Sequence, residues 1–565
     1  MLQSLGARIS DAINGLLGPV ASFLEGYVWN FPPQAPLLAV VLLGTGLFVT
    51  VRLALIQFRG FKHAIDITRG KYDDPKDAGD VVHFQALTTA LSATVGIGNI
   101  AGVAIAIRMG GPGALFWMWV TAVFGMALKF AECTLAVAHR KVHQDGSVSG
   151  GPMYYIEKGL GPKWRWMALT FASLAIVCSF GTGNMNQANT MADQLYSQFR
   201  VEPVVSAAIF STLVGLVILG GIRRIGRVTA ILAPGMAVIY VGGALVILAL
   251  HIADVPSAFA TIVGGAFSPT SVAGGAAGSF LMTLMWGIRR GLFSNEAGQG
   301  SAPIAHAAAK TDEPVREGLV ASLEPFIDTL VICSMTGLVI VSTGTHLYKA
   351  DQLLPLSSLT AVADSPASGE VHLSEAARAA AGDFTLEIRD GALGSGSLIH
   401  LGETIEEPRL LDVEGLPWTG TLLVSAASGS ISGGAQTVEG RAVLTGAPLT
   451  AQAFERGLPG ARGDLIVTLS VLLFAVSTAI SWSYYGDRAT EYVFGSGAIK
   501  VYRTVYVGFF FMGCLLPLST VWTFGDVALG LMSFPNLITL VLLSGSVAAM
   551  TRAYFAKDHT ADRHE

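Results

Sequence analysis

Four short stretches of the chain combine polar side chains with glycines inside otherwise apolar sequence. Residues 94–102 read TVGIGNIAG and residues 287–300 read GIRRGLFSNEAGQG. Residues 181–189 read GTGNMNQAN, and residues 477–488 read STAISWSYYGDR. Glycine destabilises a helix interior, and in lipid a broken helix survives only where its freed backbone groups face a cavity or a ligand. The first two stretches therefore predict interrupted helices beside a binding site.

The charges of residues 287–300 support this interpretation. Arg289, Arg290, Asn295 and Glu296 are costly at membrane depth unless they have a role. Two interrupted helices are typical of secondary transporters, where half-helix N-termini hold an anionic group and free carbonyls hold a cation. Two alternatives are that the glycines only permit close helix packing, and that some charges reach the cytoplasmic end of the span.

Hydroxyl and amide side chains supply candidate ligands. Ser477, Thr478 and Ser481 share one helical face, and their oxygens suit a hard cation such as sodium when backbone carbonyls complete the shell. The alternative is that they bond back to their own helix. Asn184 and Gln187, three residues apart, also share a face. They point either at a ligand or at a neighbouring helix.

The remaining buried charges favour structural roles. Lys129 and Glu132 are spaced i, i+3 and predict an internal ion pair. Glu324 and Asp328 have no evident cation in the sequence, so they serve either in hydrogen bonding or as proton carriers. The chain shows no histidine cluster, nucleophile elbow or nucleotide-binding loop, which predicts that it is not an enzyme and uses no organic cofactor.

The elements that position these residues follow from composition. The 565 residues are 52% hydrophobic and only 13% charged, whereas soluble domains carry about 25% charged residues. This excludes a soluble protein and predicts an all-α polytopic membrane protein. The net charge of -5 gives no basic excess for nucleic acid. The four cysteines lie in apolar stretches without CxxC pairs, which argues against disulfides and a zinc site.

Apolar windows and loop charges give the topology. A membrane-spanning helix needs about twenty apolar residues, and eleven windows qualify: 37–58, 84–107, 114–138, 166–198, 203–220, 228–251, 277–304, 319–344, 464–485, 504–516 and 526–550. One set of connections and the C-terminal tail hold 21 Lys and Arg residues, whereas the short loops on the opposite side and the N-terminal segment together hold 3. Because cytoplasmic loops accumulate Lys and Arg, the N-terminus is predicted outside and the C-terminus in the cytoplasm.

The chain therefore divides into five segments. They are an external lead-in (1–36), eight spans (37–344), an external insert (345–463), three spans (464–550) and a cytoplasmic tail (551–565). The insert holds 14 acidic and 7 basic residues, and FTLEIRD, SLIHLG, TLLVSAA and RAVLTG within it read as short strands. It is predicted to be a small, solvated, β-rich domain.

Long ordered blocks resemble the alanine or glycine:cation symporter family, which includes sodium:alanine symporters. They are residues 98–132, 146–161, 181–193, 291–309 and 481–495, and the resemblance covers nearly everything except about 346–440. It implies a leucine-transporter-like fold, in which one extra N-terminal helix precedes two inverted repeats of five helices. It also implies sodium-driven uptake of a small neutral amino acid, with the two interrupted helices opening the repeats.

Site residues carry over from the resemblance by position. It implies a substrate site formed by Thr94, Gly96, Gly98, Asn99, Gln187, Gly291, Ser294, Asn295 and Trp482. It implies a sodium site formed by Ser477, Thr478 and Ser481 with backbone carbonyls near Gly96. The family commonly has Thr where this chain has Ile97, so a hydroxyl contact is lost there.

The leading hypothesis is thus sodium-coupled symport of alanine or glycine by alternating access. The implied partners are the amino acid, sodium as coupling ion and the lipid bilayer. The predicted location is the plasma membrane, of the bacterial inner-membrane type. One alternative is proton coupling through Glu324 or Asp328. Another is a transporter-like solute sensor that acts through its external insert.

Overall fold

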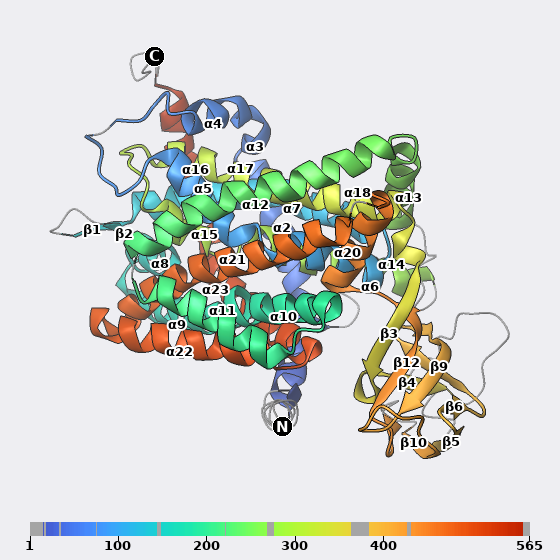
Figure 1. Ribbon diagram of the computed structural model, residues 1–565. Helices are drawn as coiled ribbons and strands as arrows, with labels where there is room; N and C mark the ends of the chain where they lie inside the picture. The colour runs from blue at the N-terminus through green and yellow to red at the C-terminus, as the bar shows by residue number, and fades with distance from the viewer. Residues whose placement is uncertain are drawn as a thin grey trace.

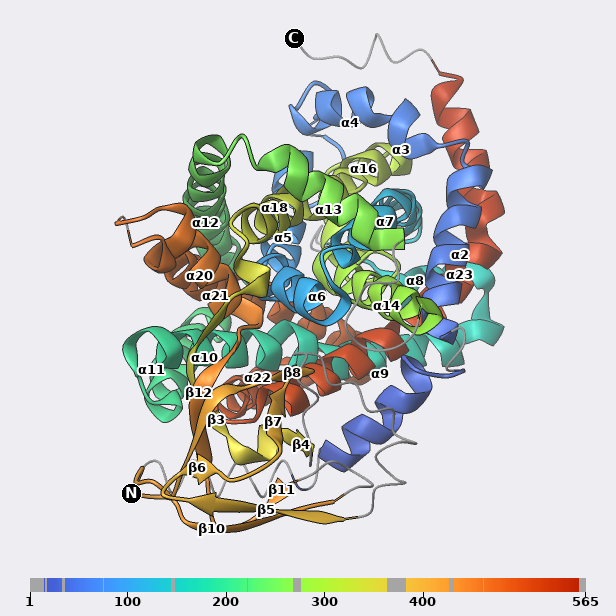
Figure 2. The same ribbon diagram turned by 90° about the vertical axis from the view of Figure 1, so that its right-hand side faces the viewer.

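A computed structural model describes residues 15, 18–32, 36–74, 76–143, 148–220, 222–267, 276–362, 383–425, 431–460 and 462–557. Most of them form a bundle of long helices, and a small sheet domain projects from one end of the bundle (Figure 1). Residues 18–32 lie at the same end as the sheet domain, and the C-terminal turns of α23 lie at the opposite end (Figures 1 and 2).

The helices that precede the sheet domain are α2 (Leu37–Arg52), α3 (Ile56–Arg59), α4 (Phe61–Thr68), α5 (His83–Thr94), α6 (Val103–Gly110), α7 (Ala114–Ala138), α8 (Pro152–Leu160), α9 (Arg165–Phe180), α10 (Asn186–Phe199), α11 (Pro203–Ile218), α12 (Ile222–Leu250), α13 (Val255–Phe267), α14 (Ala276–Asn295), α15 (Ala302–His306), α16 (Pro314–Ala321), α17 (Leu323–Pro325) and α18 (Ser334–Ser342). Those that follow it are α20 (Gly446–Gly457), α21 (Gly463–Phe494), α22 (Ile499–Gly513) and α23 (Leu518–Phe555).

Several of these helices join into longer rods through π-helical or 3-10 turns. The π-helical stretches are η1 (Gly98–Gly102), η3 (Gly181–Met185) and η4 (Phe326–Cys333), and the 3-10 turns are η2 (Pro162–Trp164), η5 (Thr345–Leu347), η6 (Leu356–Ser358) and η7 (Ser496–Ala498). Because η2, α9, η3 and α10 are continuous, one rod runs from Pro162 to Phe199.

Five helical rods in the described residues are long and apolar enough to cross a membrane: Ala114–Ala138, Pro162–Phe199, Pro314–Ser342, Gly463–Phe494 and Leu518–Phe555. Two bent pairs raise the number to seven if each pair counts as one span. One pair is His83–Thr94 with Gly98–Gly110, bent by 55°, and the other is Gly235–Leu250 with Val255–Phe267, bent by 105°. The protein is therefore a multi-pass membrane protein.

Several predicted boundaries differ from the structure, and two of them are explained by local backbone geometry or by a buried charge. α2 ends at Arg52, before residue 58, because Ala54 and Leu55 adopt left-handed backbone (φ 51° and 58°) and turn the chain into α3. The last helix begins at Leu518, directly after Pro517, rather than at residue 526. Its N-terminal part carries Asp526, a buried charge that the apolar window left at its edge.

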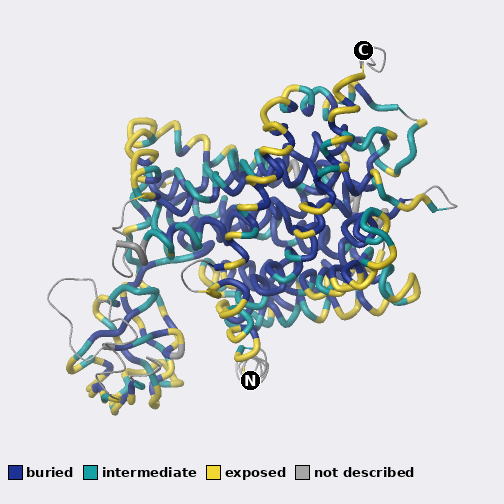
Figure 3. The backbone as a smooth tube through the Cα atoms, turned by 180° about the vertical axis from the view of Figure 1, so that it is seen from behind, coloured by how far each residue is buried: buried dark blue, intermediate teal, exposed yellow. Residues whose placement is uncertain are grey.

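The core of the bundle forms where glycines let helices approach. α7 lies against α14 and α16. A Cβ atom on Gly287 would lie 2.4 Å from the Cβ of Trp117, and one on Gly337 would lie 2.2 Å from a methyl carbon of Leu115. Close approach of α14 to α7 therefore requires glycine at position 287, and a side chain at position 337 of α18 would force Leu115 to move. Buried positions run through the middle of the bundle, as Figure 3 shows.

The insert is built from strands with a core of their own. They are β3 (Lys349–Pro355), β4 (Thr360–Val362), β5 (Phe384–Arg389), β6 (Ala392–Leu393), β7 (Ser397–His400), β8 (Glu403–Thr404), β9 (Glu406–Leu411), β10 (Gly420–Val424), β11 (Ile431–Ser432) and β12 (Thr437–Val443). An antiparallel sheet of order β11-β10-β5-β6-β9-β12-β3 accompanies a smaller one of order β4-β7-β8. A separate short pair, β1 (Lys141–Val142) and β2 (Val148–Ser149), lies on the bundle.

The end of the insert belongs to the bundle rather than to the sheets. α20 contributes Leu449 and Phe454 to the core of the bundle, and the Thr450 hydroxyl donates to the carbonyl of Ile100 (3.0 Å). In contrast, Leu386, Leu410 and Leu422 lie in the separate core of the sheet domain. The predicted insert, residues 345–463, therefore contains two parts: a sheet domain up to about residue 445, and α20, which belongs to the bundle.

Candidate functional site

The first interrupted helix is formed by α5, η1 and α6. α5 ends at Thr94 and Val95 is extended (φ -72°, ψ 92°), before the chain enters η1 at Gly98. The N–H of Gly96 donates to Oδ1 of Asn99 (2.9 Å). A Cβ atom on Gly96 would lie 2.6 Å from Oγ1 of Thr478, so glycine lets α21 approach the break.

The second interrupted helix is formed by α14 and α15. Between them Glu296, Gly298 and Gly300 take positive φ values of 56°, 84° and 89°. Oδ1 of Asn295 accepts from the N–H of Ala297 (3.1 Å), so its amide closes the end of α14. The two breaks meet, because a Cβ atom on Gly98 would lie 3.2 Å from the Cα of Ser294.

Four buried hydroxyl groups lie close together beside the first break. Ser92 lies on α5, and Ser477, Thr478 and Ser481 lie on α21; we name these four residues the hydroxyl cluster. The hydroxyls of Ser92 and Ser477 lie 2.7 Å apart, and Ser481 donates to Ser92 (3.1 Å). Thr478 donates to the carbonyl of Ser92 (3.4 Å). All three predicted residues thus contact α5 across the helix interface, which disfavours the alternative that they serve only their own helix.

The hydroxyl cluster fits a sodium ion chemically. It offers hydroxyl oxygens and a backbone carbonyl, which are the ligands that hard cations prefer, beside an unwound backbone of the kind that completes such shells. Sequence reasoning found three of its members but not Ser92. The available signal was a hydroxyl one helical turn before the TVGIGN break, in an apolar window.

Amide and acidic groups form a second cluster on the other side of the break, consisting of Asn99, Ser294 and Asp328. Nδ2 of Asn99 donates to Oδ1 of Asp328 (2.6 Å) and to Oγ of Ser294 (3.2 Å). The Ser294 hydroxyl donates to Oδ2 of Asp328 (2.5 Å). This amide–acid cluster joins η1, α14 and η4. The sequence indicates only a structural or proton-carrying role for Asp328.

The two amide side chains singled out in the sequence, Asn184 of η3 and Gln187 of α10, have different partners. Oε1 of Gln187 accepts from the N–H of Ile97 (3.4 Å), so Gln187 faces the first break. Nδ2 of Asn184 donates to the carbonyl of Tyr506 (2.7 Å) and connects this rod to α22. Gln187 therefore points at the candidate site, whereas Asn184 joins two helices.

The other predicted substrate residues lie around these clusters. Thr94 donates back to the carbonyl of Ala90 (3.3 Å). Gly291 lies against α7, where a Cβ atom would be 3.1 Å from the Cβ of Thr121. Trp482 packs on Gly183, and its indole N–H donates to Oε1 of Glu296 in the second break (2.9 Å). Trp482 thus connects α21 to both η3 and the second break.

Arg289 and Arg290 are paired at the end of the bundle that carries the N-terminal segment. Nε of Arg289 donates to Asp526 (2.6 Å), and Arg289 also pairs with Glu25. Arg290 pairs with Asp526 and stacks against Trp522 at 4.8 Å. Their charges are therefore balanced within the protein.

The predicted ion pair between Lys129 and Glu132 is wrong, and Glu324, for which the sequence showed no evident cation, has two. Lys129 pairs with Glu324 at 3.1 Å, and Glu132 accepts instead from the amide of Asn536. Glu324 also has a second cationic partner, since Nε2 of His306 lies 2.6 Å from its Oε1. Spacing along one helix shows only local partners, whereas these contacts run between helices.

Known proteins resemble this chain along most of its length. The model of the sodium:alanine symporter family matches residues 17–371 and 415–565. The sodium/alanine symporter AgcS of Methanococcus maripaludis is 38% identical over 533 residues, which cover 94% of this chain and 96% of that protein. The probable sodium/glutamine symporter GlnT of Bacillus subtilis is 32% identical over 521 residues, covering 92% and 87%.

Among solved structures, that of MhsT in complex with L-phenylalanine is 12% identical, with a TM-score of 0.49, and covers 84% of this chain and 92% of that chain. The residues that the family model leaves unmatched, 372–414, fall within the insert.

Proposed function

Because the chain belongs to the sodium:alanine symporter family, we propose that it carries alanine or glycine across the membrane together with sodium, by alternating access. The sequence resemblance is confirmed, and the family is one of transporters rather than enzymes. The observation that supports the proposal most is the meeting of two interrupted helices beside a buried hydroxyl cluster.

We propose a leucine-transporter-like architecture with eleven spans. In this arrangement α2 is the extra helix, and the interrupted helices α5–α6 and α14–α15 open the two repeats. The Lys and Arg distribution supports an external N-terminus and a cytoplasmic C-terminus, and we propose a bacterial inner membrane as the location. The placement of the N-terminal segment and the sheet domain at one end of the bundle agrees with this topology.

Sodium is proposed to bind at the hydroxyl cluster, with carbonyls near Gly96 completing its shell. The ion would connect α21 to α5 beside the break, so its binding would favour one arrangement of the two helices. A tenfold sodium gradient and a potential of 100 mV together supply about 3.7 kcal/mol per ion. That is enough for roughly several hundredfold accumulation of the amino acid.

The substrate is proposed to bind between the two breaks. Its carboxylate would lie at the positive N-terminal end of η1, and Asn99, Gln187 and Ser294 would supply hydrogen bonds. Gly96 and Gly98 bring backbone close to the ligand and leave little room for a side chain. Thr94, Gly291, Asn295 and Trp482 would complete the surrounding wall.

Competition assays are expected to show a preference for small amino acids. Excess unlabelled alanine or glycine should abolish the uptake of labelled alanine into proteoliposomes, because both fit between the breaks. Excess leucine or phenylalanine should leave most of the uptake in place, since a larger side chain would meet Trp482 or the glycine-lined backbone. Equal inhibition by leucine and alanine would contradict the proposed pocket size.

Removal of the sheet domain is expected to preserve transport. Lys349 and Val443 are direct partners in the β3–β12 pairing, so deleting residues 350–442 and adding a short Gly/Ser linker joins neighbouring positions. A change in loop length costs about 0.6 kcal/mol per doubling. Alanine uptake by this variant should stay within about twofold of the wild type.

A matched control extends the deletion to residue 457 and removes α20, whose Thr450 holds the carbonyl of Ile100 in η1. This variant should lose uptake. If the shorter deletion inserts into the membrane normally but does not transport, the sheet domain takes part in transport.

A further inference from the structure

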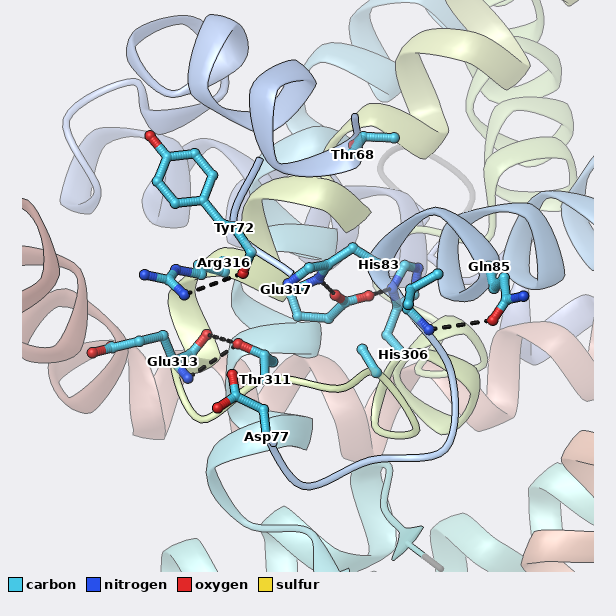
Figure 4. Close-up of polar contacts among 12 residues, drawn as sticks. Thr68, Tyr72, Asp77, His83, Gln85, His306, Thr311, Glu313, Arg316 and Glu317 are labelled. Atoms are coloured by element: carbon cyan, nitrogen blue, oxygen red, sulfur yellow. Dashed lines mark hydrogen bonds and ion pairs between the residues drawn. The ribbon is translucent and has the colours of Figure 1, made fainter. Parts of the chain in front are cut away.

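A chain of buried titratable side chains lies at the end of the bundle opposite the sheet domain, and we name it the histidine–glutamate chain. Nδ1 of His83 and Nδ1 of His306 each contact one carboxylate oxygen of Glu317 (Figure 4). Nε2 of His306 contacts Glu324 (2.6 Å), whose other oxygen accepts from Lys129 (3.1 Å). All five side chains are fully buried.

Hydrogen-bond chemistry requires one additional proton in this chain. A neutral imidazole has one N–H donor, and an ionised carboxylate only accepts. Both ring nitrogens of His306 face carboxylate oxygens, so a neutral His306 would leave one contact without a hydrogen. His83 needs only the hydrogen on Nδ1, since its Nε2 has no partner among the described residues.

Charge balance leads to the same count. Glu317, Glu324 and Lys129 together carry one net negative charge, and an uncompensated charge in a buried site is strongly destabilising. One more proton makes the histidine–glutamate chain neutral. Other titratable and charged groups near it include Glu132 and Cys133 of α7, Arg140 just after α7, Glu296 of the second break, Asp328 of η4 and Tyr485 of α21. Glu132 and Glu296 favour a bound proton further, whereas the positive charge of Arg140 opposes it.

The histidine–glutamate chain connects the elements that must separate if this end opens. His83 begins α5 and His306 ends α15, so each lies on one half of an interrupted helix, and both contact Glu317 of α16. Arg140 seals the same end by donating to the carbonyls of Ala78 and Thr311 (2.8 Å each).

We propose that a single proton, held between His306 and the carboxylates of Glu317 and Glu324, keeps this end of the transporter closed. When α15 separates from α16 and α17, His306 loses its two acceptors, Glu317 and Glu324, and releases the proton to water. The proton is then a ligand of the closed state, in addition to sodium and the amino acid. This inference rests on the proposed alternating access, but its tests need no transport.

The first test measures the proton directly. The full-length protein, labelled with ¹⁵N-histidine and reconstituted in bilayers, is examined by solid-state NMR at pH 8. An ordinary histidine has a pKa of about 6.5 and is mostly neutral at pH 8. His400 in the insert is neutral at that pH as well, because burial and repulsion by Arg108 lower its pKa to about 4. We expect an imidazolium signal that His306→Gln removes.

Glu317→Gln provides a second variant if His306→Gln fails to fold. Its amide can donate to Nδ1 of a neutral His306 and accept from His83, so it removes the need for the additional proton. The imidazolium signal should disappear in Glu317→Gln and persist in Glu313→Gln. Glu313 is the matched control because it pairs with Lys557 outside the histidine–glutamate chain. A wild-type protein without an imidazolium signal at pH 8 would overturn the proposal.

The second test measures closure. Cys133 is buried against Ala302 of α15 and Ala321 of α16, so a thiol reagent reaches it only when this end opens. Its labelling rate, measured by peptide mass spectrometry and normalised to free cysteine at each pH, should rise by up to about tenfold per pH unit, as expected for loss of one proton. Glu313→Gln should keep this dependence and Glu317→Gln should lose it. Equal pH dependence in both variants would overturn the link to closure.

Discussion

Thr478→Ala should raise the sodium concentration for half-maximal alanine uptake by about 10- to 100-fold, the range expected when a group around a bound ion is removed. Thr478 donates to the carbonyl of Ser92 and lies where Gly96 approaches α21. Because sodium and substrate binding are coupled, alanine affinity at a fixed low sodium concentration should fall as well. Both quantities are measured in proteoliposomes over a series of sodium concentrations.

Ser483→Ala is the matched control for this experiment. Ser483 is buried on the same helix, but its hydroxyl donates to the carbonyl of Ile480 in that helix (2.6 Å). The sodium dependence of this variant should match that of the wild type. A correctly folded Thr478→Ala protein with unchanged sodium dependence would show that the hydroxyl cluster does not bind the coupling ion.

Lys129→Met is expected to lower the free energy of unfolding by about 3 to 5 kcal/mol, because it removes one partner of a buried ion pair. Lys129 and Glu324 are both fully buried and lie 3.1 Å apart on different helices. The variant leaves Glu324 with His306 as its remaining cationic partner. Unfolding of the purified protein in mixed micelles, followed by circular dichroism, measures the change.

The double variant Lys129→Met/Glu324→Gln removes both charges and should recover part of this loss. The comparison separates the effect of an unpaired carboxylate from the effect of a changed side-chain shape. If the single variant is as stable as the wild type, the Lys129–Glu324 pair is not a structural element of the bundle.

The sequence predicted the interrupted helices well because their cause is local. A run such as Thr94–Gly102 combines glycines and polar residues at membrane depth, and each of these is unfavourable in a plain membrane helix. The shared face of Ser477, Thr478 and Ser481 was visible for the same reason, since helical spacing alone defines it.

The partners of these residues were not visible, because packing between distant helices decides them. Ser92 lies 385 residues from Ser477 in sequence, and Lys129 lies 195 residues from Glu324. The i, i+3 spacing of Lys129 and Glu132 suggested a pair, but each side chain has a partner on another helix. The histidine–glutamate chain was missed for the same reason, since His83 and Glu317 are 234 residues apart.

Uptake of labelled alanine into proteoliposomes, with an inward sodium gradient or with choline in place of sodium at the same pH, tests the central proposal most directly. The account predicts accumulation above the equilibrium level with the sodium gradient and none with choline. Accumulation that is equal in choline and is driven instead by a proton gradient would contradict sodium coupling.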